Sequence, residues 1–240
     1  MSSRAEFDHY AHNYGELLRG KLRDGFARDN SFYHARKWML IADFLRSHDF
    51  WRSDLTWLDV GCGKGELLSY GRSHFGRVVG CDLSREMIRD TDGIEVHLQR
   101  SPTVLPFENE SFDFVTAVCV YHHVDEPDRI PLTREIERVL RRDGIFCMIE
   151  HNPFNPVTRL IVNRCPVDVD AHLLMARSAR RYARSVGLKH LETQYFLYLP
   201  EKIYAKIPRM ERYFTKLPLG GQYATFSVKC LERPCTSPVV

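Results

Sequence analysis

The sequence has no long apolar segment and no strong excess of charge of either sign. No run of about 18 consecutive apolar residues occurs, so no membrane-spanning helix is expected. The net charge of the 240 residues is only +3, which by itself gives no indication of nucleic-acid binding. The first residues also lack the apolar stretch of a secretory signal. These absences predict a cytoplasmic protein.

Paired cysteines are missing as well. The seven cysteines are scattered and odd in number, and none belongs to a Cys-x-x-Cys pair. Four of them lie in apolar, strand-like runs or in a glycine-rich loop. This distribution is typical of reduced, buried thiols and argues against a disulfide framework.

What the sequence does contain is an ordinary balance of 44% hydrophobic and 27% charged residues, enough to bury a sizeable core. From residue 56 onward, short apolar runs alternate with stretches of helical spacing. Strands that alternate with helices form parallel sheets with right-handed crossovers, so the sequence predicts an α/β fold. The predicted strands span residues 56–60, 77–81, 112–120, 144–149, 191–199 and 223–230, with helices over 132–140 and 179–186 between them.

Two further helices are predicted before the first strand. Apolar side chains from Phe7 to Leu18 follow one helical period, and a second set runs from Phe32 to Leu45. We therefore expect residues 1–50 to form an N-terminal helical cap and residues 51–240 to form the main domain. Within that domain, residues 200–221 are an unusual insert between the last two strands.

The clearest functional signal is the segment DVGCGKG, which begins at Asp59. A strand predicted to end at Val60 is followed by Gly61, Gly63 and Gly65. Because glycine has no Cβ atom, such a loop lets the backbone approach a ligand closely. A dinucleotide pyrophosphate is one candidate ligand, but Asp59 would repel its negative charge. A ligand with an ammonium group is favoured instead.

A second acidic residue, Asp82, ends the next predicted strand, RVVGCD. A carboxylate at the carboxyl end of a strand can accept hydrogen bonds from both hydroxyls of a ribose. The alternative is that Asp82 only caps the following helix. Together with the glycine loop, Asp82 favours a nucleoside ligand that has a cationic amino-acid end.

These segments resemble the class I S-adenosylmethionine-dependent methyltransferases over roughly residues 8–230. DVGCGKG resembles the family's methionine-binding loop and GCDLSREMI its ribose- and adenine-binding segment, while LPFENESFDFV, VYHHVDEP and LRRDGIFCMIE resemble the segments around its fourth and fifth strands. The resemblance implies S-adenosylmethionine as the cofactor. It also implies a Rossmann-like, seven-stranded, mostly parallel sheet with helices on both faces and an antiparallel last strand. It assigns cofactor binding to Asp59, Gly61, Cys62, Gly63, Gly65, Asp82, Leu83, Met87, Ser101 and Val120.

Ser101 is a departure from the family pattern. The family usually has Asp four residues before the leucine of the Leu-Pro-Phe run, where it accepts a hydrogen bond from the adenine amino group. Ser101 occupies that position here. A hydroxyl can accept the same bond but without charge, so either the cofactor binds less tightly or the neighbouring backbone contacts the adenine.

Methyl transfer from a sulfonium requires a positioned acceptor and, for a hydroxyl, a base. The candidate bases are His122 and His123 after the fourth strand and His151 after the fifth. For His123 the alternative is a structural role, in which it forms a hydrogen bond with the following turn. The candidate acceptor-binding residues are Tyr10, Tyr14, Glu150, Asn152 and Asn155. For the two tyrosines the alternative is a place in the buried face of the N-terminal helix, and for the others a solvated turn.

No metal site is expected. His122 and His123 are adjacent, so we expect their side chains to point apart rather than to chelate one ion. The predicted function is O-methylation of a small molecule or of a glycan- or lipid-linked acceptor. N-methylation and a non-catalytic cofactor-binding protein are the alternatives. Nucleic-acid substrates are not expected, because VYHHV replaces the motifs of the adenine and cytosine methyltransferases. The sequence gives no indication of oligomeric state.

The insert allows two interpretations. Ile203, Ile207, Met210 and Phe214 form an apolar face that Pro208 interrupts. In one interpretation this face belongs to a kinked helix and packs on the core. In the other the insert forms a wall of the acceptor site, and its neighbouring basic residues contact a membrane surface.

Overall fold

The computed structural model describes residues 3–89 and 91–230, which fold around one seven-stranded sheet. The strand order is β3-β2-β1-β4-β5-β7-β6, with β7 antiparallel to both of its neighbours and the other pairs parallel. This is the predicted Rossmann-like sheet with an antiparallel last strand. The strands are β1 (Thr56–Val60), β2 (Arg77–Asp82), β3 (Glu95–Leu98), β4 (Phe112–Val118), β5 (Leu140–His151), β6 (Lys189–Phe196) and β7 (Gln222–Val228).

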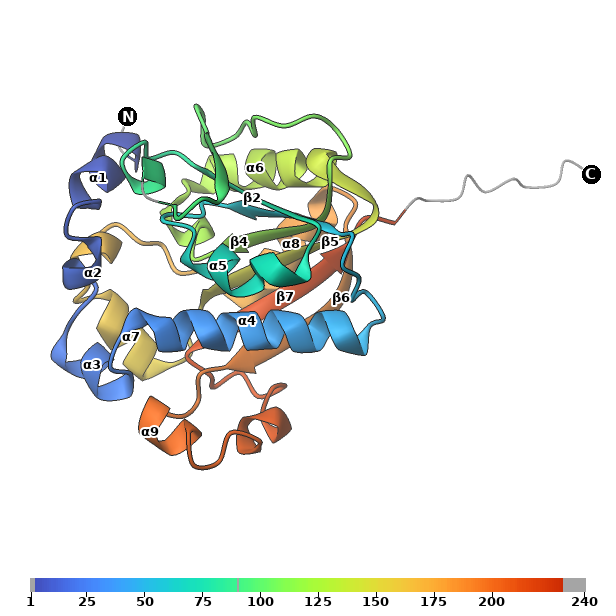
Figure 1. Ribbon diagram of the computed structural model, residues 1–240. Helices are drawn as coiled ribbons and strands as arrows, with labels where there is room; N and C mark the ends of the chain where they lie inside the picture. The colour runs from blue at the N-terminus through green and yellow to red at the C-terminus, as the bar shows by residue number, and fades with distance from the viewer. Residues whose placement is uncertain (1–2, 90, 231–240) are drawn as a thin grey trace, which may run out of the picture.

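Helices cover both faces of the sheet (Figure 1). On one face, α4 (Asn30–Ser47) and α5 (Glu66–Gly71) pack Phe44 and Leu68 against Trp57. On the other face, α6 (Glu126–Val139) and α8 (Ala176–Ser185) pack against Leu58 and Val60. Neighbouring residues of β1 thus point into opposite cores, which explains why every residue of this strand is buried.

The shorter helices lie mainly at one end of the sheet (Figure 1). α1, α2, α3 and α7 stand along that end, while α9 lies beside the end of α4. Their bounds are α1 (Ser3–Tyr10), α2 (Tyr14–Leu17), α3 (Lys21–Phe26), α7 (Pro156–Val162) and α9 (Glu201–Tyr204), and the 3₁₀ turns are η1 (Arg72–His74), η2 (Met87–Arg89), η3 (Tyr121–His123), η4 (Pro166–Asp168) and η5 (Met210–Tyr213). No helix of the described residues is long and apolar enough to cross a membrane.

The N-terminal segment forms two helices rather than the one predicted. α1 ends at Tyr10, a turn closed by the Asn13 N–H and the Tyr10 carbonyl follows, and α2 begins at Tyr14. Asn13 and Gly15 interrupt the apolar period with residues of low helix propensity. The helical spacing of the apolar side chains is therefore present, but the backbone does not carry one helix through it.

The insert also departs from the prediction that its apolar face packs on the core. Ile203, Ile207 and Met210 are 45%, 41% and 36% exposed. The buried anchor is instead Glu211, which is 3% exposed and forms an ion pair with Arg36 of α4. The other Glu211 oxygen accepts hydrogen bonds from the backbone of residues 198 and 199 at 2.9 Å each. A charged contact therefore anchors this segment, together with the aromatic contact of Tyr204 with Phe32.

We predict that Glu211→Ala lowers the free energy of unfolding by about 3 kcal/mol, because it leaves the buried Arg36 guanidinium without its counter-charge. Urea unfolding followed by circular dichroism measures the loss. The matched control is Asp43→Ala, which removes an exposed ion pair with Arg212 and should cost less than about 1 kcal/mol. Equal losses in the two variants would contradict the anchoring role of Glu211.

Candidate active site

A cavity of about 1170 Å³ lies at the carboxyl ends of β1, β2, β4 and β5. The chain runs outward from β1 to β3 and then returns to the other side of β1, so this is the switch point at which open α/β sheets bind ligands. Pockets for single small ligands hold roughly 300–1,000 Å³, so this cavity has room for a cofactor and a second molecule. Its walls include Asp59, Asp82, Val118 and His151 from the strand ends, and Phe7, Tyr14, Leu22 and Ile161 from the helices above them.

The glycine loop forms one wall of the cavity. Gly61, Gly63 and Gly65 have φ angles of +70°, +54° and +75°, and Gly65 is the N-cap of α5. A Cβ atom on Gly61 would lie 2.5 Å from Val120 Cγ2. Both the close approach and the left-handed backbone therefore require glycine at position 61. Gly65 itself does not line the cavity, because it turns the chain into the helix.

Two acidic side chains face the cavity from neighbouring strands. Asp59 is 2% exposed and accepts a hydrogen bond of 2.5 Å from the Thr116 hydroxyl. Burial raises the pKa of Asp59 to about 7. Asp82 accepts hydrogen bonds from the N–H groups of Gly63 (2.8 Å) and Ser84 (2.9 Å). Asp82 thus holds the glycine loop against β2 as well as facing the cavity.

Ser101 lies outside the lining of the cavity. Its hydroxyl accepts a hydrogen bond from the Thr103 N–H at 3.4 Å and contacts the Thr103 hydroxyl. The cavity wall in this stretch comes from Gln99, Arg100 and Pro102. The expectation that the Ser101 hydroxyl replaces the family's adenine-binding carboxylate therefore has no support in the geometry, because the side chain serves a local turn.

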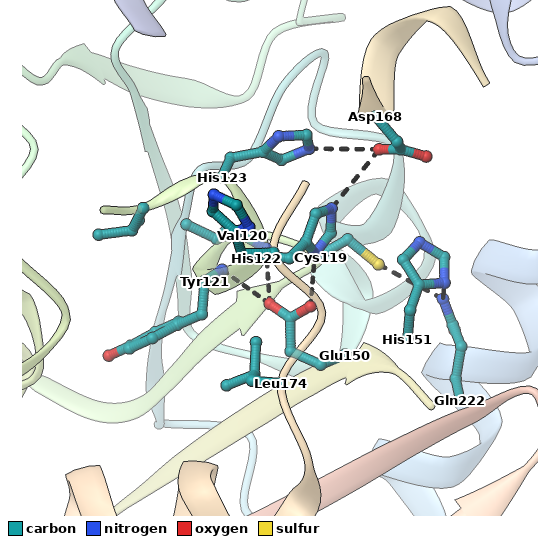
Figure 2. Close-up of polar contacts among 12 residues, drawn as sticks. Cys119, Val120, Tyr121, His122, His123, Glu150, His151, Asp168, Leu174 and Gln222 are labelled. Atoms are coloured by element: carbon teal, nitrogen blue, oxygen red, sulfur yellow. Dashed lines mark hydrogen bonds and ion pairs between the residues drawn. The ribbon is translucent and has the colours of Figure 1, made fainter. Parts of the chain in front are cut away.

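Glu150 does not line the cavity, and its carboxylate contacts the turn that follows β4 (Figure 2). It is fully buried, and one carboxylate oxygen accepts hydrogen bonds from the N–H groups of Val120 (3.0 Å) and Tyr121 (2.7 Å). The other oxygen lies 2.5 Å from His122 Nδ1. Direct acceptor binding by Glu150 is therefore contradicted, since its oxygens are already used by protein groups. Its role is to fix the turn that follows β4.

Asn152 is also misplaced for acceptor binding. It is 1% exposed, and its Nδ2 donates to the carbonyls of Pro218 (3.0 Å) and Gly220 (2.8 Å). Asn155 does line the cavity, where it caps α7 by accepting a 2.9 Å bond from the Thr158 N–H. Its Nδ2 donates to the Leu219 carbonyl at 2.7 Å, so the amide of Asn155, like that of Asn152, is used to hold the chain.

His122 and His123 converge on one carboxylate that the sequence did not single out. Asp168 Oδ1 lies 3.6 Å from His122 Nε2 and 3.4 Å from His123 Nε2 (Figure 2). The prediction that the adjacent histidines point apart is therefore wrong, because the 3₁₀ turn η3 directs both rings toward η4. Although burial opposes protonation, Glu150 and Asp168 raise the pKa of His122 to about 10. Burial lowers the pKa of His123, and Asp168 opposes this.

A second group that the sequence did not reveal surrounds Cys119, which follows β4 with a φ of +58°. Its sulfur lies 3.8 Å from Lys37 Nζ and 3.4 Å from Gln222 Nε2. Burial would raise the pKa of this thiol, but the charge of Lys37 and the contact with His151 lower it to about 7. Lys37 is 7% exposed and lies on the same helix face as Ile41 and Phe44. In the sequence, Lys37 stands at the helical spacing of Ile41 and Phe44, and this spacing was the available sign that Lys37 is buried.

Of the two tyrosines in the N-terminal segment, only one lines the cavity. Tyr14 lines the cavity, and burial raises the pKa of its hydroxyl. Tyr10 packs against the rings of Phe7 and His9 and does not line the cavity. Within residues 200–221, only Pro200 at the start and Gly221 at the end line the cavity. Most of the insert lies away from the site.

The comparisons with known proteins agree with this geometry. Residues 58–148 match the family model described as a methyltransferase domain. Residues 58–148 are a methyltransferase domain. The domain uses S-adenosylmethionine as its cofactor, and Asp59, Gly61, Gly63 and Asp82 belong to the lining of the cavity described above.

Similarity to individual proteins is partial. A demethylmenaquinone methyltransferase of Lactococcus lactis is 33% identical over 47% of this chain and 52% of its own. A tRNA (carboxymethyluridine(34)-5-O)-methyltransferase of Saccharomyces cerevisiae is 29% identical over 47% of this chain and 41% of its own. The chain spans about half the length of the curated relatives it matches.

A solved structure shows the same fold. A methyltransferase from Archaeoglobus fulgidus superposes with a TM-score of 0.60 at 16% identity, covering 80% of this chain and 94% of its own. At this identity the likeness concerns the fold alone.

We predict that Cys119 reacts with iodoacetamide with a midpoint near pH 7, because the thiolate is the reactive form and its fraction rises through the pKa. Peptide mass spectrometry across a pH series measures the midpoint. Lys37→Met removes the nearby positive charge and should shift the midpoint upward. The same peptide in the urea-unfolded chain should react with a midpoint of about pH 8.5. Identical profiles for folded and unfolded protein would show that the cluster does not act on this thiol.

Proposed function

We propose that this protein transfers a methyl group from S-adenosylmethionine to a hydroxyl of a small, largely apolar acceptor. The observation that carries the proposal is that one cavity joins two chemically different halves. One half holds the glycine loop, Asp59 and Asp82. The other half is lined by apolar side chains from α3, α7 and the end of β6, namely Leu22, Phe26, Val157, Ile161 and Leu197.

The cofactor half offers complementary charges at one end. In this proposal Asp59 faces the ammonium of the amino-acid moiety, and the buried Lys37 ammonium faces its carboxylate. Asp82 offers its carboxylate to the ribose, while Leu83 and Met87 flank the adenine. Cys62 and Val120 complete the wall beside the glycines. When bound, the cofactor supplies an electrophilic methyl group, so the remaining task of the protein is to orient the acceptor and receive its proton.

The acceptor half favours a small molecule over a polymer. Its lining comes from helices that close over the strand ends, and its apolar side chains stand beside the basic Lys21 and Arg23 of α3. The similarity to a demethylmenaquinone methyltransferase supports an apolar ring compound, while the tRNA methyltransferase relative names the competing class. A lipid-linked acceptor and peripheral contact through the exposed Ile203, Ile207 and Tyr213 are secondary proposals, which sedimentation with anionic vesicles tests.

Proton removal falls to one of two histidines. Both ring nitrogens of His122 face carboxylates, which retain its proton. His123 and His151 both line the cavity, and neither is held between two carboxylates in this way. We assign the base to one of these two groups.

The direct test of the function is a screen of hydroxylated and aminated small molecules, with release of S-adenosylhomocysteine as the readout. Turnover of hydroxylated ring compounds supports the proposal. Turnover of amines alone establishes N-methylation instead, and turnover of tRNA alone would replace the small-molecule proposal.

We predict that affinity for S-adenosylhomocysteine rises about tenfold between pH 6 and pH 8, because Asp59 loses its proton near pH 7 and then attracts the ammonium. Isothermal titration calorimetry measures the change. Asp59→Asn should bind more weakly and without this pH dependence. The matched control is Cys119→Ser, which removes another group with a pKa of about 7. This variant should keep the rise in affinity between pH 6 and pH 8.

The assignment to Asp59 fails if Asp59→Asn retains the same slope. Asp82→Ala should cost about 1.5–3 kcal/mol of binding at every pH, as expected for loss of a charged hydrogen-bond partner. NAD that binds more tightly than S-adenosylhomocysteine would overturn the cofactor assignment altogether.

We further predict that at least one of His123→Asn and His151→Asn lowers kcat about 10²- to 10⁴-fold, the usual contribution of a general base. Affinity for S-adenosylhomocysteine should stay unchanged in the affected variant. Steady-state kinetics with the identified acceptor decides between the two residues. Near-normal kcat in both variants would mean that positioning alone drives the reaction.

A further inference from the structure

The part of the cavity wall formed by η3 and η4, its polar end, has the composition of a metal site. His122, His123 and Asp168 each offer one donor atom, and these atoms all lie within 4.8 Å of one another. Within residues 3–89 and 91–230, no other three such side chains come together in this way. Two imidazoles and one carboxylate are the protein ligands of catalytic zinc sites and of non-haem iron sites.

The distances between the donor atoms are close to those around a bound ion. Asp168 Oδ1 lies 3.4 Å and 3.6 Å from the two Nε2 atoms, and the longer value exceeds an ordinary hydrogen bond. Around an ion with ligand bonds of about 2.0–2.1 Å, neighbouring donor atoms lie about 3.0–3.4 Å apart. Movements of a few tenths of an ångström would bring both measured distances into this range.

The ligands are held in place by surrounding bonds. His122 Nδ1 faces Glu150 at 2.5 Å, so Nε2 is the atom directed toward Asp168. An ion that binds Nε2 displaces the proton from this nitrogen, while Glu150 keeps the proton on Nδ1. This carboxylate–histidine pair is the arrangement that orients metal-binding imidazoles in known sites. Asp168 is fixed by its backbone, whose N–H donates to the Cys165 carbonyl at 3.0 Å and whose carbonyl accepts from the Ala171 N–H at 3.0 Å.

We propose that His122, His123 and Asp168 bind one divalent transition-metal ion at the polar end of the cavity. Nitrogen ligands favour zinc, cobalt or iron over magnesium and calcium, which prefer oxygen. All three residues line the cavity, so the remaining coordination positions face the space that the acceptor would occupy. The proposal replaces the sequence-based expectation of no metal site.

The metal site stands independently of the proposed function, but the two are compatible. An oxygen of the acceptor is a suitable further ligand, and coordination lowers the pKa of a bound hydroxyl. With His123 engaged as a ligand, His151 is the histidine left to receive the proton.

The test uses chelator-treated protein titrated with Co²⁺, whose visible absorption reports coordination by protein ligands. We expect one Co²⁺ per chain, displaced by Zn²⁺. Asp168→Asn and His123→Asn should each weaken Co²⁺ binding at least tenfold, and Zn²⁺ should raise Tm in the native protein but not in these variants. Two ligand variants are used so that misfolding of one, seen by circular dichroism, leaves the other to decide.

Two controls separate this site from others. His172→Asn changes a histidine that lines the same cavity but lies outside the cluster, so its Co²⁺ affinity should be unchanged. Cys119→Ser tests the thiol site near His151 and should also bind normally. Absence of stoichiometric Co²⁺ binding overturns the proposal. Unchanged affinity in both ligand variants, or loss of binding in Cys119→Ser, overturns it equally.

Discussion

The buried carboxylate of Glu150 determines how the end of β4 meets the end of β5. It has no exposed surface. It accepts hydrogen bonds from the backbone N–H groups of residues 120 and 121, and it contacts His122. Burial alone would raise the pKa of Glu150, but the charge and hydrogen bond of His122 lower it. A charged group at this depth is tolerated only because every oxygen has a partner. The positions of Val120, His122 and His123 all follow from this one residue.

The rest of the site shows the same use of buried charge at strand ends. Asp59 and Asp82 come from β1 and β2, and Lys37 reaches the cavity from α4 on the face of Trp57. Opposite charges of this kind favour a ligand with the complementary charge pattern. In the proposed function, the part lined by α3, α7 and Leu197 holds the acceptor, and its apolar side chains favour the burial of an apolar molecule. One sheet edge therefore presents two kinds of selectivity side by side.

Sequence reasoning was most accurate where the signal is local. β1 was predicted at its observed bounds, because a short apolar run between a turn and a glycine loop has few alternatives. β3 was not recognised, since Glu95 and His97 make it resemble a polar loop. For the insert the sequence left two interpretations open, and neither included the ion pair of Glu211 with Arg36, 175 positions away, that anchors this segment. The roles of Glu150, Asn152 and Ser101 were also misjudged, because exposure depends on neighbours that the local sequence does not name.

By itself, the sequence determined the α/β fold, the glycine loop and the two acids at the ends of β1 and β2, because each depends on residue types and spacings within a few positions of the chain. Only the tertiary structure decided which distant side chains meet at the polar end of the cavity. Asp168 reaches His122 and His123 from η4, and Lys37 and Gln222 reach Cys119 from α4 and β7. These meetings depend on the path of the chain over the sheet and on how each helix is rotated against it. A spacing pattern along the sequence carries no record of either quantity, so such clusters emerge only when the strands and helices are packed.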